Sequence, residues 1–265
     1  MAKALEDQVF QQVDERPPAA DIQFEPTRRR VRVMFGGATV ADTKSVMLVI
    51  ENRRLAIYYF PVKDVRLDLF QPTSYKSQHE GRGEASFFSV KVGDRTAEKA
   101  AWRYVTPQRP QLKDHVAFYW DKMDAWFEED DEVFVHPRNP YHRVDVLNSS
   151  RHVKVVVGGV VVAETHRPRL LFETGLPTRY YIPKVDTRLD LMAPTTTSTR
   201  CPYKGKASYW SLNVNGKEYK DIVWGYPAPI PECPKIENLL CFYDEKVDAV
   251  YVDGELQKKP VTPWS

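Results

Sequence analysis

The sequence has few cysteines, no long apolar run and no signal peptide. It contains three cysteines in 265 residues, Cys201, Cys233 and Cys241, a number and spacing that fit free thiols better than a disulfide framework. No apolar stretch approaches the roughly 18 residues of a membrane span, and the amino terminus lacks the basic flank and apolar core of a signal peptide. We therefore expect a cytoplasmic protein with no membrane partner.

The sequence also lacks a large excess of either charge sign and the common cofactor-binding motifs. The 38 basic and 36 acidic residues nearly cancel and are interspersed, so no positive field argues for a nucleic-acid partner. Dinucleotide-binding, P-loop and Gly-x-Ser-x-Gly signatures do not occur. No Cys-x-x-Cys, His-x-His or His-x-x-x-His pair suggests a metal. The sequence thus predicts neither a metal site nor a cofactor.

The most informative feature that is present is an internal repeat. Residues 29–70 and 151–192 share a Gly-Gly pair, Ala-(Asp/Glu)-Thr, a glutamate, Tyr-Tyr-x-Pro and Asp-x-Arg-x-Asp-Leu in the same order. Three landmark pairs are each 122 residues apart: Gly36 and Gly158, Pro61 and Pro183, Asp68 and Asp190. The chain is a tandem duplication of a unit of ordinary domain size.

Each copy has the pattern of an antiparallel β domain. Alternating apolar residues flank Gly36-Gly37 and Gly158-Gly159, which predicts type I′ hairpins, and Gly93-Asp94 aligns with Asn215-Gly216 as a second turn. Twenty prolines, 12% aromatic residues and the lack of long helical periodicity predict an all-β fold. A weak helical pattern over residues 1–16 predicts one short amino-terminal helix.

The predicted organisation has four parts. Residues 1–27 form the helix and a connection, residues 28–135 the first repeat, residues 136–147 a linker, and residues 148–265 the second repeat. The linker holds two prolines but also Tyr141, His142 and Arg143, which favours an ordered strap packed against both domains. Because gene duplication often fuses a former homodimer, we expect the repeats to pack as an intrachain pseudo-dimer.

The motifs resemble a known family. Gly-Gly-x-Val-x-Ala-(Asp/Glu)-Thr, Tyr-Tyr-x-Pro-x-x-Asp-x-Arg-x-Asp-Leu and the stretch from Cys201 to Trp210 are similar to domain of unknown function 427, over residues 28–265. The resemblance implies a compact, tent-like fold in which two antiparallel sheets lean together over a groove. The family also carries a nucleotidyltransferase label. Here Asp186 and Asp190 would lie about 13 Å apart along an extended strand with Arg188 between them, which favours an ion network over a shared magnesium.

The candidate site is in the second repeat, because the copies differ there. Residues 201–205 read Cys-Pro-Tyr-Lys-Gly, whereas residues 79–83 read His-Glu-Gly-Arg-Gly, so only the glycine is identical. Lys204 is predicted to hold a carboxylate or phosphate, or to act as a nucleophile if burial lowers its pKa; otherwise it covers aromatic residues with its stem. Glu173 is the candidate general base, or else pairs with Arg188, and Tyr181 is a candidate acid–base group. The remaining predicted ligand-binding residues are Tyr203, Tyr209, Trp224 and Arg188.

These residues lead to two functional hypotheses. The first is a tandem β-domain protein that binds a small, anionic organic ligand in the groove of the second repeat and acts on it without a metal or cofactor. The alternative is a non-catalytic structural or protein-interaction module, whose aromatic pocket is filled by its own side chains.

Overall fold

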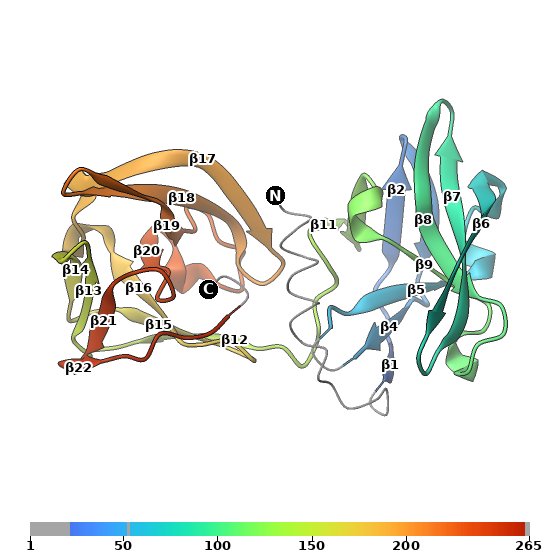
Figure 1. Cartoon of the computed structure of the whole chain (residues 1–265). Helices are drawn as coiled ribbons and strands as arrows, with labels where there is room; N and C mark the ends of the chain where they lie inside the picture. Colours follow the sequence, from blue (N-terminus) through green and yellow to red (C-terminus); the bar gives the residue numbers. More distant parts are fainter. Residues whose placement is uncertain (1–21, 52–53, 263–265) are drawn as a thin grey trace. The chain divides into compact units, whose positions relative to one another are not determined.

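A computed structural model describes residues 22–51 and 54–262, which form β-strands joined by turns and single-turn 3₁₀ helices. These residues divide into two compact units, residues 22–139 and 140–262 (Figure 1). The helix predicted over residues 1–16 lies outside the described residues. No helix in the described ranges is long and apolar enough to cross a membrane.

The first unit contains two antiparallel sheets. A seven-stranded sheet has the order β1-β4-β5-β9-β8-β7-β6, and a four-stranded sheet has the order β11-β10-β2-β3. The strands are β1 (Gln23–Pro26), β2 (Val31–Phe35), β3 (Ala38–Thr43), β4 (Met47–Ile50), β5 (Ile57–Pro61), β6 (Phe70–His79), β7 (Gly83–Val92), β8 (Arg95–Tyr104), β9 (His115–Phe118), β10 (Ala125–Glu128) and β11 (Asp131–Val133). The 3₁₀ helices are η1 (Val62–Asp64), η2 (Leu67–Leu69), η3 (Pro110–Leu112) and η4 (Trp120–Lys122).

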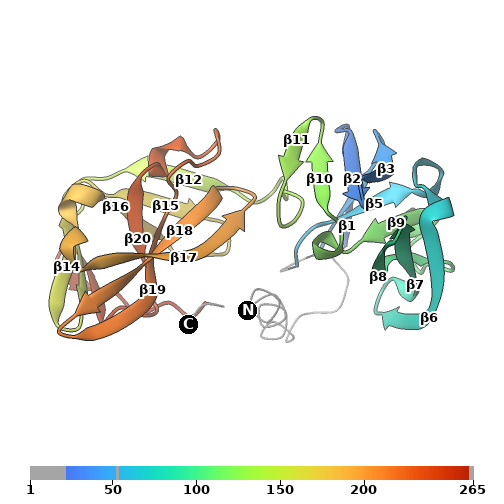
Figure 2. The same ribbon diagram turned by 90° about the horizontal axis from the view of Figure 1, so that it is seen from above.

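The second unit repeats this topology strand for strand. Its sheets have the orders β12-β15-β16-β20-β19-β18-β17 and β14-β13-β21-β22, and Figure 2 shows β17, β18 and β19 side by side. The strands are β12 (Val144–Asn148), β13 (Val153–Val157), β14 (Val160–Thr165), β15 (Arg169–Glu173), β16 (Arg179–Pro183), β17 (Met192–Cys201), β18 (Gly205–Val214), β19 (Lys217–Gly225), β20 (Leu239–Phe242), β21 (Ala249–Val252) and β22 (Glu255–Leu256). The 3₁₀ helices are η5 (Lys184–Asp186), η6 (Leu189–Leu191) and η7 (Pro234–Ile236). The predictions of a tandem repeat and an all-β fold are confirmed.

The glycine pairs form the predicted hairpins. Gly36 and Gly37 join β2 to β3, and Gly158 and Gly159 join β13 to β14. All four have φ between 58° and 78°, the left-handed region that a type I′ turn requires and that glycine adopts without a steric penalty. This part of the fold follows from local sequence alone.

The Asp-x-Arg-x-Asp segment differs from the prediction of an extended strand. Asp186 ends η5 and Asp190 lies in η6, so the two acids are not on one strand face. Arg188 binds only the nearer Asp190, with nitrogen–oxygen distances of 2.8 and 2.6 Å. Asp186 instead accepts hydrogen bonds from Arg167 and from Thr165. The three residues therefore do not form the single ion network predicted along an extended strand, because Asp186 and Asp190 lie in two separate 3₁₀ turns.

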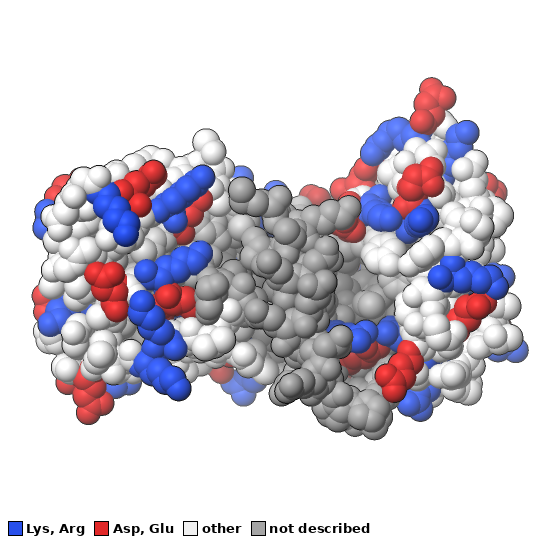
Figure 3. Space-filling view, in the orientation of Figure 1, with Lys and Arg blue, Asp and Glu red and all other residues white. Residues whose placement is uncertain are grey.

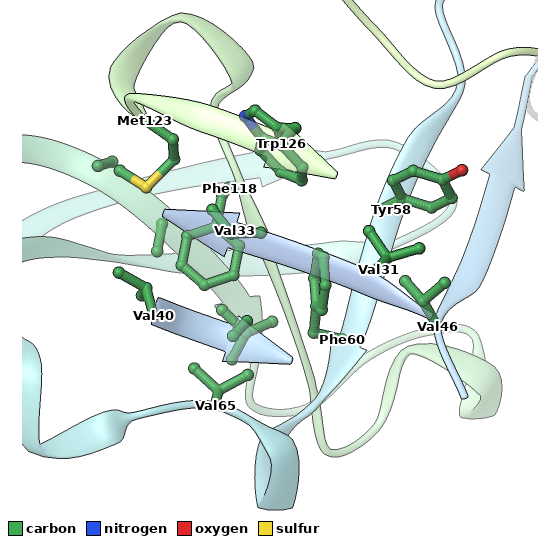
Figure 4. Close-up of a cluster of buried hydrophobic side chains, with 14 of the residues drawn as sticks. Val31, Val33, Val40, Val46, Tyr58, Phe60, Val65, Phe118, Met123 and Trp126 are labelled. Carbon is green, nitrogen blue, oxygen red and sulfur yellow. The ribbon is translucent and has the colours of Figure 1, made fainter. Parts of the chain in front are cut away.

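The large sheet of each unit is apolar on both faces. In β5, Tyr58 and Phe60 point into a core between the two sheets, whereas Tyr59 points to the opposite face, as the twofold period of a strand requires. Figure 4 shows the inter-sheet core, in which the Phe60 ring lies 5.6 Å from Phe118 and 6.0 Å from Trp126. The opposite face carries a second, smaller aromatic cluster, and this face positions the candidate site.

Two segments assigned to connections from the sequence contain strands. β1 lies within residues 1–27 and pairs with β4, and β12 begins within residues 136–147 and pairs with β15.

On the face of the molecule shown in Figure 3, basic and acidic side chains are interspersed over both units.

Candidate functional site

The candidate site lies on the face of the second unit's large sheet that turns away from the small sheet. Tyr181 in β16 points to this face, whereas its neighbour Ile182 enters the inter-sheet core. The buried cluster here is formed by Leu171, Tyr181, Ala207, Tyr209, Trp224, Tyr226, Cys233, Ile236 and Cys241. Three polar side chains meet beside this largely apolar, aromatic cluster.

These three side chains are His142, Glu173 and Lys204. Glu173 ends strand β15, Lys204 lies in the turn between β17 and β18, and His142 precedes strand β12. The Lys204 Nζ atom lies 2.5 Å from Glu173 Oε2, and His142 Nε2 lies 3.1 Å from Glu173 Oε1. Both carboxylate oxygens are therefore engaged, and Glu173 does not pair with Arg188 as one prediction had it.

The ion pair is buried and charged. Lys204 is 8% exposed, and the Glu173 side chain is equally inaccessible. Burial alone would raise the pKa of Glu173, but the hydrogen bond from His142 and the charge of Lys204 outweigh it and lower that pKa. Burial alone would lower the pKa of Lys204, but the nearby Cys201 and Glu173 outweigh it and raise that pKa. Lys204 is thus an ammonium ion at neutral pH and not a free amine.

Two predicted aromatic residues, Tyr181 and Trp224, contact each other inside the cluster. Their rings meet edge to face with centroids 6.5 Å apart, and the Trp224 indole N–H donates to the Tyr181 hydroxyl at 3.3 Å. Tyr181 is 1% exposed, and this burial raises its pKa well above the usual value. The Tyr181 phenol therefore keeps its proton at neutral pH.

The other predicted residues divide between the cluster and the surface. Tyr209 is buried in the cluster, and its hydroxyl lies 2.8 Å from Thr199 Oγ1. Tyr203 is half-buried and stacks on His142 with ring centroids 4.3 Å apart. Arg188 is not brought to this group; its half-exposed side chain pairs with Asp190 on an exposed turn.

The close approach of a loop explains why glycine occupies this position in both copies. Gly205 has φ +104°, and a Cβ atom there would lie 3.2 Å from the backbone nitrogen of Ile230 and 3.4 Å from the carbonyl oxygen of Ala228. The loop approaches closely because the Ile230 amide donates to the Lys204 carbonyl at 3.1 Å. Gly83, with φ +102°, lies under the equivalent loop of the first unit. The absence of a side chain at Gly205 therefore allows the loop backbone to pack directly against the turn that carries Lys204.

The first repeat contains an equivalent of the ion pair. Arg82, aligned with Lys204, lies 3.0 Å from Glu51, which is aligned with Glu173, and Arg82 is also buried. The Trp102 indole donates to Tyr59 at 3.3 Å, as Trp224 does to Tyr181. The sequence difference at residues 201–205 therefore does not remove the ion pair from the first repeat, because its basic charge is kept as arginine. Besides the exchange of Lys204 for Arg82, the copies differ at Cys201, Pro202 and Tyr203, which align with His79, Glu80 and Gly81.

The comparison of the repeats also reveals residues that sequence analysis missed. His142 is one, and its position in the linker concealed its contact with Glu173. Arg179, Asp244 and Glu245 form another group: Arg179 binds Glu245 at 2.8 and 2.5 Å and lies over the Trp224 ring at 5.5 Å. The aligned residues of the first copy are Ile57, Trp120 and Asp121. Comparison of the two copies in the sequence could therefore have singled out these three positions.

No metal-binding arrangement accompanies the cluster. Within residues 22–51 and 54–262, no group of three or more histidine, cysteine, aspartate or glutamate side chains is placed to hold a metal ion. The chemistry that the arrangement itself offers is an ammonium ion, a carboxylate and an imidazole beside aromatic rings.

Comparison with known proteins agrees with the two-unit architecture. A family model described as domain of unknown function 427 matches residues 23–129 and again residues 145–253, which is more than half of the chain. A search of the curated proteins finds no match. The two matches fall one in each structural unit, and the chain belongs to the domain of unknown function 427 family as a tandem member with two copies of the domain.

Proposed function

We propose that the second repeat binds a small anionic organic ligand at the cluster of His142, Glu173 and Lys204, and acts on it by acid–base chemistry without a metal or cofactor. The observation that carries the proposal is the convergence of these three side chains, from three separate segments, beside an aromatic cluster. Lys204 keeps its positive charge, so its role is to attract the ligand's anionic group rather than to attack it.

The His142–Glu173 pair is the acid–base element of the proposal. A carboxylate that binds one imidazole nitrogen fixes the orientation of the ring. The His142 side chain is 21% exposed, so it is the most accessible of the three polar groups. Tyr203 stacks on His142 at the outer side of the cluster and packs the ligand there. Tyr181, Tyr209 and Trp224 support the site from beneath, because all three are buried.

The two repeats offer a matched test of this proposal. Thermal-shift titration with a panel of small carboxylates and phosphate monoesters is carried out on the full chain and on Lys204→Ala, His142→Ala and Arg82→Ala. We expect a ligand-dependent rise in Tm that is lost in Lys204→Ala and reduced in His142→Ala, but kept in Arg82→Ala. Equal responses of Lys204→Ala and Arg82→Ala would contradict the proposal.

A second candidate is the structural or interaction module, and one observation favours it. Arg82 and Glu51 repeat the buried ion pair in the first unit, together with the Tyr59–Trp102 contact. A feature shared by both copies is what a folding requirement produces. Under this alternative, no compound in the panel raises Tm, and Lys204→Ala and Arg82→Ala both lower the free energy of unfolding.

A further inference from the structure

The second unit has a cavity whose lining residues all lie outside the His142–Glu173–Lys204 cluster. Its volume is about 180 Å³, and it opens to solvent. It is lined by the turn that leads into β16, by the segment after β20 and by the segment that follows β22. Its polar lining includes Thr178, Tyr180, Asp244, Lys258 and Lys259.

Asp244 supplies a buried carboxyl group to this cavity. Its nearest cation is Arg179, at 3.8 Å, which is too long for a hydrogen bond. Arg179 instead donates two hydrogen bonds to Glu245. Glu245 also accepts a hydrogen bond from Thr262 at 2.5 Å. Among the residues that the structure describes, none makes a hydrogen bond to the Asp244 side chain, although that side chain is only 12% exposed. The carboxyl group is thus partly desolvated without a close partner.

Two lysines also line the cavity. Lys258 and Lys259 are exposed and line it together with Tyr180 and Thr178. The cavity therefore offers positive charge from the segment after β22 and a negative or neutral carboxyl group from the segment after β20. Its volume is below the roughly 300–1,000 Å³ of a drug-sized ligand site. The cavity therefore suits a small molecule.

We propose that this cavity binds a small zwitterion of the amino-acid class, with the ligand's ammonium group on Asp244 and its carboxylate on Lys258 and Lys259. A simple anion would satisfy the lysines but leave Asp244 without a partner. A simple amine would satisfy Asp244 but meet repulsion from the two lysines. A molecule with both charges satisfies all three groups, and this site is independent of the function proposed above.

Binding at this site depends on pH. Burial raises the pKa of Asp244 to about 7, with Arg179 lowering it and Glu245 raising it. Tyr180, Lys258 and Lys259 also face the cavity. A bound ammonium group stabilises the ionised carboxylate, so the affinity rises as the pH increases from about 6 to 8, and binding at the lower pH releases a proton.

Calorimetric titration of the full chain tests the proposal. The probes are glycine, β-alanine and γ-aminobutyrate, with propionate and propylamine as matched ligands that carry one charge only. We expect at least one amino acid to bind about tenfold tighter than either control, and to lose about tenfold in affinity in Asp244→Asn and in Lys258→Ala/Lys259→Ala. Lys220→Ala, a change at an exposed lysine in β19, serves as the control variant and keeps the affinity.

Three results would overturn the assignment. They are no binding by any of the amino acids, binding of propionate as tight as that of the amino acids, and unchanged affinity in either cavity variant. The lysine variant alters exposed side chains only, so the test remains decisive even if Asp244→Asn were to disturb folding.

Discussion

The Arg82 guanidinium lies 3.0 Å from the Glu51 carboxylate in the first repeat, at positions aligned with Lys204 and Glu173 in the second. The duplication has therefore kept a buried pair of opposite charges while changing the identity of the cation. The surroundings differ more than the pair itself. Each carboxylate has a second basic partner, His142 at 3.1 Å for Glu173 and Arg54 at 3.3 Å for Glu51, but among the described residues the buried Arg82 Nε atom has no hydrogen-bond partner. The second repeat thus satisfies its ion pair more fully.

Removal of the cation from this pair is expected to destabilise the second unit. Lys204→Met leaves the Glu173 carboxylate buried with His142 as its one remaining partner, and such a loss lowers the free energy of unfolding by about 3 kcal/mol. Lys204→Arg reproduces the pair of the first repeat and should lower it by less than about 1.5 kcal/mol. Urea denaturation measures both, with the exposed Lys206→Met as the control. A Lys204→Met variant as stable as this control would show that the pair contributes nothing.

Asp244 is expected to make stability fall as the pH rises towards neutrality. Its carboxyl group ionises at about 7 in the folded chain, above its ordinary value of 3.8. Between these values the folded state binds more protons than the unfolded state, so the free energy of unfolding decreases with increasing pH. Asp244→Asn should therefore match the wild type near pH 4 and exceed it by about 1–3 kcal/mol near pH 8. Parallel pH profiles of the two proteins in urea denaturation would contradict this.

Gly205 is expected to tolerate no side chain. Gly205→Ala places a Cβ atom at φ +104° and within 3.2 Å of the Ile230 backbone, so both backbone strain and a steric contact oppose it. The expected loss of unfolding free energy is about 2–4 kcal/mol. Gly216→Ala separates the two effects, because Gly216 has φ +76° but no atom within 4 Å of the added Cβ. It should lose only about 1 kcal/mol. Equal losses in the two variants would remove the argument from loop contact.

Separate expression tests the organisation of the chain. Because each unit has its own pair of sheets and its own core, fragments 1–139 and 140–265 should each unfold cooperatively. The origin of the chain by duplication predicts that the fragments associate when mixed, as a fused homodimer would. Sedimentation of the mixture measures this, and two folded fragments that stay monomeric would refute the pseudo-dimer.

The elements that could be predicted from sequence depend on local rules. Gly36-Gly37 and Gly158-Gly159 specify hairpins because glycine adopts the two successive positive φ angles of a type I′ turn without strain. The alternation through Tyr58, Tyr59 and Phe60 specifies a strand with two apolar faces. The same reasoning failed at Asp186 and Asp190, because the two 3₁₀ turns there carry no marker that separates them from an extended strand.

The candidate site was only partly predictable, because its contacts join residues that are distant in sequence. The difference between the copies at residues 201–205 led to Lys204, and the repeated glutamate led to Glu173. Nothing in the sequence placed them 2.5 Å apart, or brought His142 from the linker to the same carboxylate. Arg188 was assigned to the site from its neighbours in sequence, but its side chain bonds to Asp190 two residues away.

The sequence by itself determined the duplication, the β-strand content, the hairpins and the family, because these depend on periodicity, on glycine backbone freedom and on motif spacing. Only the tertiary structure decided which charges meet: Glu173 with Lys204 and His142, and Arg179 with Glu245 rather than with the more distant Asp244. The physical reason is that pKa values and ion pairs depend on burial and on distances of a few ångströms between separate strands. Those quantities exist only once the sheets are packed.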